Sequence, residues 1–123
     1  MSDKTPTDLI NRFYEEMLAE RFDYALDAAD PAYHSLTEIS EIDPQSLRAS
    51  CAAIADDIVD LKRRVFKEFN NGNEGVVLHE YTGRSKATGK IVRLRSADYY
   101  EVRAGKLLVH WGALQFEEPA EDQ

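Results

Sequence analysis

The residues that decide the fold lie near the end of the chain, in the stretch Asp-Tyr-Tyr-Glu-Val-Arg-Ala-Gly-Lys-Leu-Leu-Val-His-Trp at positions 98–111. Ala104-Gly105 separates two runs of aromatic and aliphatic side chains, which is the pattern of two strands joined by a tight turn. Polar and apolar residues alternate over residues 90–103, so the first strand is long. Residues 107–116 form the second strand. This stretch therefore predicts an antiparallel hairpin at the end of the domain.

Two more strands are predicted upstream of this hairpin. Residues 75–82 are rich in β-branched and aromatic side chains, and the turn residues 85–89 separate them from the long strand. An asparagine and glycine cluster at 70–75 tolerates positive φ and marks the preceding turn. The stretch that begins near Leu61 fits the strand that leads into it.

The first half of the chain has helical patterns. Thr5 fits an N-cap with Pro6 at the first helical position, and apolar residues follow at helical spacing. These residues are Leu9, Phe13, Met17 and Leu18. A short helix over residues 23–29 would place Leu26 inward and must end near Asp30-Pro31.

A third helix begins at Asp43-Pro44, again a cap followed by a first-turn proline. One of its faces is apolar and carries Leu47, Cys51, Ile54 and Ile58. Helices followed by a meander of strands is the order of an α+β domain, in which the helices pack on one face of an antiparallel sheet.

The composition bounds the class of protein. The 123 residues predict one domain, with a core at about 7–116 and an acidic tail at 117–123. A net charge of −8 opposes binding to nucleic acid or to anionic membranes. Cys51 is the single cysteine, which excludes an internal disulfide and zinc sites with several thiolates. No signal or membrane-spanning stretch is expected, so we expect a cytoplasmic protein.

The order of these elements, with the Gly-Lys-apolar hairpin and the His110-Trp111 pair, resembles the nuclear transport factor 2-like superfamily, and within it the SnoaL-like branch of polyketide cyclases. The resemblance covers about residues 7–116. It implies a cone-shaped, cystatin-like α+β fold, with a curved antiparallel sheet wrapped round a long helix. It also implies an apolar pocket inside the cone and a homodimer formed through the outer faces of the sheets.

The resemblance carries over to single residues only in part. SnoaL-like cyclases have an acid/base carboxylate four residues after the tryptophan, where this chain has Gln115, which cannot transfer a proton at neutral pH. The residue directly after that tryptophan is often aspartate, and here it is Gly112. The ketosteroid isomerase branch has an acid that donates a hydrogen bond at the position of Asp98, but its base would fall at Ser35, next to His34.

From these positions we predict a catalytic set and a ligand-binding set. The catalytic candidates are Asp98, His110, His34 and Tyr14, and the ligand-binding candidates are Tyr33, Tyr100, Trp111 and Gln115. The three histidines are not clustered in the sequence, so we expect no metal ion, and we expect no other cofactor.

Asp98 shares its strand face with Val92 and Leu94, so it should face the apolar side. Burial alone would raise the pKa of this carboxyl and favour a catalytic acid, whereas an arginine partner would lower the pKa and indicate a structural pair. The sequence is compatible with both alternatives, the catalytic acid and the structural pair.

The functional hypothesis is a pocket for a small, largely apolar organic molecule, with acid/base chemistry of the isomerase, dehydratase or cyclase type. The alternative is a non-catalytic dimeric module that binds a ligand or a protein. Polar groups converging on open volume would favour chemistry, and a filled apolar interior would favour the module.

Overall fold

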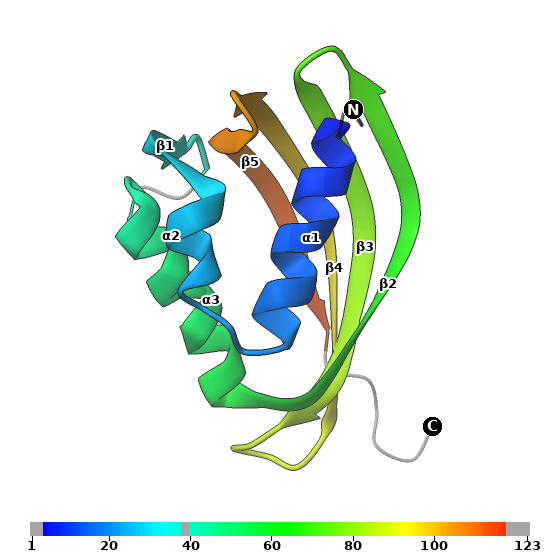
Figure 1. Ribbon diagram of the computed structural model, residues 1–123. Coiled ribbons are helices and arrows are strands. Elements are labelled where there is room, and N and C mark those ends of the chain that lie inside the picture. The colour runs from blue at the N-terminus through cyan, green and yellow to red at the C-terminus, as the bar shows by residue number, and fades with distance from the viewer. Residues whose placement is uncertain (1–3, 38–39, 118–123) are drawn as a thin grey trace.

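The computed structural model describes residues 4–37 and 40–117 (Figure 1). Helix α1 spans Pro6–Leu18, and its predicted N-cap is confirmed. The Thr5 hydroxyl accepts a hydrogen bond from the Asp8 N–H at 3.2 Å, and the Asp8 carboxylate accepts one from the Thr5 N–H at 3.0 Å. The helix buries Ile10, Phe13 and Met17. The predicted core positions Leu9 and Leu18 are only half-buried.

The other two helices also lie where the sequence predicts them. Helix α2 spans Tyr24–Ala28 and buries Ala25, while Leu26, predicted to point inward, is only half-buried. Helix α3 spans Pro44–Asp57, and Ile54 on its predicted apolar face is 44% exposed because this face borders a cavity. Ile58, predicted on the same helical face, lies instead at the start of the next strand. No helix in the described residues is long and apolar enough to cross a membrane.

Strand β1 (Ala29–Ser35) is absent from the sequence prediction. It pairs in parallel with the last strand, with Ser35 opposite His110, so the sheet is not wholly antiparallel. The segment is short, contains Pro31 and does not alternate in burial, which hides it from pattern recognition. β1 lies at the sheet edge, where a proline without an N–H donor is tolerated.

The four remaining strands form the predicted meander. They are β2 (Ile58–Asn71), β3 (Glu74–Ser85), β4 (Ile91–Arg103) and β5 (Lys106–Glu117), each antiparallel to the next. The predicted turn between β4 and β5 has positive φ at both central residues, 50° at Ala104 and 77° at Gly105. With β1 at the edge, the sheet order is β1-β5-β4-β3-β2.

The sheet curves round α1, and α2 and α3 lie beside this helix (Figure 1). The main core forms between helices and sheet, from Phe13 on α1 to Val77 on β3 and Tyr100 on β4. The α+β class with helices on one face of a curved sheet is therefore confirmed. The predicted tail at 117–123 lies, beyond residue 117, outside the described residues.

The opposite face of the sheet carries an apolar row. Phe69, Val76, Tyr99 and Trp111 lie in register across four strands, and Phe69 and Trp111 are about half exposed. Farther along the strands, Glu80 is in contact with arginines from β2 and β4, and its shortest contact is with Arg95, at 2.9 Å. This face thus has an apolar part and a charged part.

Candidate functional site

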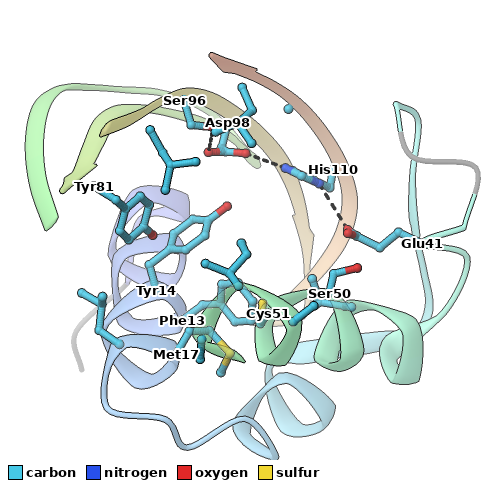
Figure 2. A pocket seen from close by; sticks show the side chains of 18 of the residues that line it. Phe13, Tyr14, Met17, Glu41, Ser50, Cys51, Tyr81, Ser96, Asp98 and His110 are labelled. Atoms are coloured by element: carbon cyan, nitrogen blue, oxygen red, sulfur yellow. Dashed lines mark hydrogen bonds and ion pairs between the residues drawn. The ribbon is translucent and has the colours of Figure 1, made fainter. Parts of the chain in front are cut away.

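A cavity of about 690 Å³ lies between the sheet and helices α1 and α3. Most of its wall is apolar, from Phe13 and Met17 on α1 to Leu94 and Leu114 on the sheet. Polar side chains gather on one side of it (Figure 2). These include Glu41, Ser96, Asp98 and His110. The interior is therefore open and apolar, with one polar wall.

Asp98, on β4, is at the centre of this wall and is 5% exposed. Its Oδ2 lies 2.6 Å from Nε2 of His79 on β3 and accepts a hydrogen bond from the Ser96 hydroxyl at 2.6 Å. Its Oδ1 lies 2.7 Å from Nε2 of His110 on β5. One carboxyl group therefore accepts hydrogen bonds from three side chains.

These donors decide the protonation state of Asp98. Burial acts to raise the pKa of this carboxyl, but the hydrogen bonds from His110, His79 and Ser96 outweigh it and hold the pKa well below its usual range. The direction is the one that the structural-pair alternative predicts, although the partners are histidines rather than an arginine. Asp98 is a carboxylate at neutral pH and has no proton to donate.

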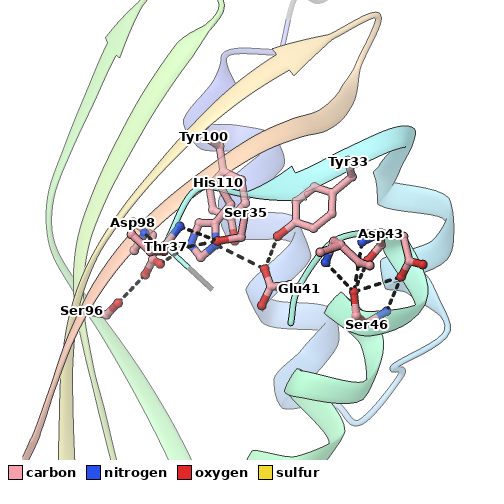
Figure 3. A network of polar contacts seen from close by, with 12 residues as sticks. Tyr33, Ser35, Thr37, Glu41, Asp43, Ser46, Ser96, Asp98, Tyr100 and His110 are labelled. Carbon is pink, nitrogen blue, oxygen red and sulfur yellow. Dashed lines mark hydrogen bonds and ion pairs between the residues drawn. The ribbon is translucent and has the colours of Figure 1, made fainter. Parts of the chain in front are cut away.

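His110 lies between two acids. Its Nδ1 is 3.4 Å from Oε1 of Glu41, and its ring stacks on Tyr100 with centroids 4.5 Å apart. Burial alone would lower the pKa of His110, but Asp98 and Glu41 together raise it to about 9. Glu41 also accepts a hydrogen bond from the Tyr33 hydroxyl (Figure 3). The site thus holds an imidazolium between two carboxylates at neutral pH.

Gly112 provides the room for this arrangement. It lies directly opposite Asp98 in the pairing of β4 with β5. A Cβ atom at this position would lie 2.8 Å from Oδ1 of Asp98 and 2.9 Å from Nε2 of His110, closer than atoms can pack. A glycine at position 112 is therefore a steric requirement of the Asp98–His110 contact.

Two tyrosines complete the polar groups around the cavity. The hydroxyl oxygens of Tyr14 and Tyr100 are 2.8 Å apart, and both residues line the cavity. Burial raises the pKa of both phenols well above the ordinary value, so both stay protonated. Two hydroxyls carry two protons and their mutual hydrogen bond uses one. The second proton has no acceptor among the described residues.

The structure brings together Tyr14, Asp98, Tyr100 and His110 from the predicted set and places the others elsewhere. His34 is exposed on β1, and Tyr33 is buried behind Glu41 without lining the cavity. Trp111 and Gln115 lie on the outer face of the sheet and are exposed.

A bulge explains the placement of Trp111 and Gln115. In the pairing of β5 with β4, Glu101 opposes Val109 but Val102 opposes Leu107, so one residue of β5 is extra. Alternation counted from Leu107 would turn residues 111 and 115 inward. The bulge turns His110, Gly112 and Leu114 inward instead.

Sequence reasoning did not assign roles to Glu41, His79 or Ser96. His79 shares its strand face with the buried Val77, a signal that could have placed it beside Asp98. Glu41 lies in a segment without periodicity before α3, and nothing in the sequence indicates its position.

The chemistry open to the remaining groups is limited. Cys51 borders the cavity, and burial, with Glu41 and Asp98 nearby, raises the pKa of its thiol to about 12, so it is no thiolate at neutral pH. Within residues 4–37 and 40–117, no three His, Cys, Asp or Glu side chains are placed to hold a metal ion. Proton transfer and hydrogen bonding are therefore what the described wall offers.

Comparison with known proteins identifies the fold. No family model and no curated protein matches the sequence. Among solved structures, TsrD from Streptomyces laurentii superposes with a TM-score of 0.81 at 17% identity, over 94% of this chain and 92% of that one. A SnoaL-like polyketide cyclase from Agrobacterium tumefaciens gives a TM-score of 0.80 at 14% identity, over 92% and 93%.

A nuclear transport factor 2-like protein from Burkholderia thailandensis also matches, with a TM-score of 0.73 at 15% identity, over 92% of each chain. These identities are low and the coverage is nearly complete, so the likeness is one of fold. The chain has the nuclear transport factor 2-like fold, as its sequence pattern indicated.

Proposed function

We propose that the cavity binds a small, largely apolar organic molecule and that the polar wall performs acid/base chemistry on it, of the isomerase, dehydratase or cyclase type. The observation that carries this proposal is the Asp98–His110–Glu41 cluster on the wall of an open apolar cavity of about 690 Å³. Perturbed titratable groups in such a cavity are typical of functional sites.

Each polar group of the wall has a separate role in this reaction. One hydroxyl group of the Tyr14–Tyr100 pair has a proton that their mutual hydrogen bond does not use. This hydroxyl donates a hydrogen bond to a carbonyl oxygen of the ligand. Glu41 removes a proton from the carbon next to that carbonyl, and the electron pair of the broken C–H bond moves toward the oxygen. The positive charge of His110 stabilises the enolate that forms.

Asp98 is a positioning residue in this scheme. Its three hydrogen bonds and its lowered pKa make it a weak base. Its contact with Nε2 holds the His110 ring in place and keeps it charged.

The charges of the wall favour an uncharged ligand. Asp98 and Glu41 carry two negative charges against the one positive charge of His110, and no lysine or arginine is among the lining residues described. A ligand carboxylate would enter a net negative, poorly solvated site, which costs free energy. We therefore expect a neutral ring ketone to bind better than its carboxylate-bearing analogue.

The test uses 1-tetralone, a neutral bicyclic ketone, in D₂O. NMR follows the exchange of its α-protons for deuterium with the wild-type chain, with Glu41→Gln and with the control Glu16→Gln, whose side chain does not line the cavity. We expect exchange above the buffer rate, a loss of about 100-fold or more for Glu41→Gln, and no change for the control. Binding without exchange would instead support the non-catalytic module, and failure to bind neutral ring ketones would overturn the proposal.

A further inference from the structure

The two histidines that flank Asp98 have opposite surroundings. Both present Nε2 to the carboxylate, at 2.6 Å for His79 and 2.7 Å for His110. Behind His110, Nδ1 faces the carboxylate of Glu41. Behind His79, Nδ1 lies 2.9 Å from Nε of Arg63 on β2 and accepts its hydrogen bond. One ring is thus backed by an acceptor and the other by a donor.

The hydrogen-bonding partners of His79 determine which of its ring nitrogens carries the proton. A guanidinium only donates, so Nδ1 of His79 must accept and cannot carry a proton. The proton of His79 is therefore on Nε2, where it is donated to Asp98. His110 faces a carboxylate at each nitrogen, so both of its nitrogens can hold protons. His79 is a neutral donor, and the charge is on His110.

The side chain of Arg63 is buried and is fixed in the position from which it donates its hydrogen bond to His79. Its side chain is 2% exposed, although it does not line the cavity. From α1, Asn11 Oδ1 accepts from its Nη2 at 2.6 Å, and the exposed Glu15 carboxylate lies 3.3 Å from Nη1. Its guanidinium also lies 5.2 Å from the ring centre of Tyr14. Burying a cation costs free energy, so a specific set of partners must compensate for it.

We propose that Arg63 and His79 are positioning residues that act on His110 through Asp98. The hydrogen bond from Arg63 prevents His79 from taking a second proton. Asp98 therefore contacts only one charged histidine, His110, which lines the cavity. The rings of Tyr14 and Tyr81 pack on His79 and supply no competing charge. The role in catalysis rests on the proposed function, whereas the protonation pattern does not.

The experiment measures histidine protonation directly. The full chain with ¹⁵N-labelled histidine is studied by NMR at pH 6, where nitrogen shifts distinguish the two neutral tautomers from the doubly protonated ring. In the wild type we expect His79 to carry its proton on Nε2 alone and His110 to be doubly protonated. In Arg63→Met we expect a measurable fraction of His79 to take a second proton, because the opposing cation and donor are lost.

Two further variants separate positioning from structural support. Arg63→Lys restores a cationic donor and should return His79 to the neutral form. Arg64→Met removes the neighbouring arginine, whose contacts are with Glu80 and Phe66 on the outer face, and should change neither histidine. If Arg63→Met does not fold, His79→Gln replaces it. Its amide can accept from Arg63 and donate to Asp98, and His110 should then stay doubly protonated at pH 6.

The outcomes separate the two proposals. A wild-type His79 with its proton on Nδ1, or with two protons at pH 6, overturns the inference. An Arg63→Met variant in which His79 is unchanged, or a His79→Gln variant in which His110 loses its charge, does so as well. The expected protonation pattern together with no deuterium exchange in ring ketones would leave this inference standing and reject the proposed function.

Discussion

Replacing Gly112 by alanine should break the central contact of the site. The added Cβ would lie 2.8 Å from Oδ1 of Asp98, 2.9 Å from Nε2 of His110 and 3.0 Å from its Cε1. All three distances are shorter than packed atoms allow. Two backbone strands fix the Cβ position, so the Asp98 and His110 side chains must move apart.

The size of the effect follows from the His110 pKa. The His110 pKa rises from 6.5 to about 9 against the opposing effect of burial, which corresponds to a net preference of roughly 3 kcal/mol for the charged imidazole in the folded protein. A hydrogen bond between charged groups contributes about 1.5–3 kcal/mol, and a side chain forced into a packed site costs about 1–3 kcal/mol. We expect Gly112→Ala to lower the free energy of unfolding by about 2–4 kcal/mol and the His110 pKa by about one unit or more.

Urea unfolding followed by Trp111 fluorescence measures the first quantity, and an NMR titration of His110 measures the second. Gly83→Ala is the matched control, because its Cβ would lie 2.6 Å from Ile58 Cγ2 and 2.9 Å from the Val59 carbonyl oxygen, away from the charged cluster. The control should lose stability and keep the His110 pKa. A Gly112→Ala variant with a His110 pKa still near 9 and stability within about 0.5 kcal/mol of wild type would refute the reasoning.

Three other predictions concern the same charges and the outer face. Folding raises the His110 pKa from 6.5 to about 9, so the contribution of His110 to the free energy of unfolding is complete below pH 6.5 and is lost as the pH rises through 9. Urea unfolding at a series of pH values should show this decline in stability, and His110→Gln should abolish the decline. Asp98→Asn removes the nearer of the two carboxylates that flank His110 and leaves only Glu41, at 3.4 Å, so it should lower the free energy of unfolding by about 1.5–3 kcal/mol and bring the His110 pKa below 9, as measured by NMR. We expect a homodimer through the apolar row on the outer face, and Trp111→Glu should give a monomer in sedimentation; a wild-type monomer at micromolar concentration contradicts this.

Local patterns in the sequence were sufficient for much of the fold. The Thr5 cap, the Ala104-Gly105 turn and the alternation along β4 each depend on neighbouring residues, and each has the predicted structure. The inward position of Asp98 followed from the same alternation. Strand β1 has no such local signal, since its pairing with β5 joins residues far apart in the chain.

The site was less predictable than the fold, because its contacts also join residues that are far apart in the chain. One bulge in β5 reverses the side on which Trp111 and Gln115 lie, and a bulge leaves little trace in a sequence. Glu41 reaches His110 from a segment nearly seventy positions away in the chain. The low pKa of Asp98 comes from partners on two other strands, which a single strand pattern cannot contain.

The place of β5 between β1 and β4 has a consequence for synthesis at the ribosome. Chain growth delivers β1 before β2, β3 and β4, and β5 after them, so the edge strand must wait for its neighbour in the described sheet until the three intervening strands have emerged. The apolar wall facing α1 stays open to solvent during that interval, and such surfaces are prone to aggregate or to bind chaperones. Contacts between distant segments also slow folding. His110 arrives with β5, so the charged cluster forms only after this strand has joined β4.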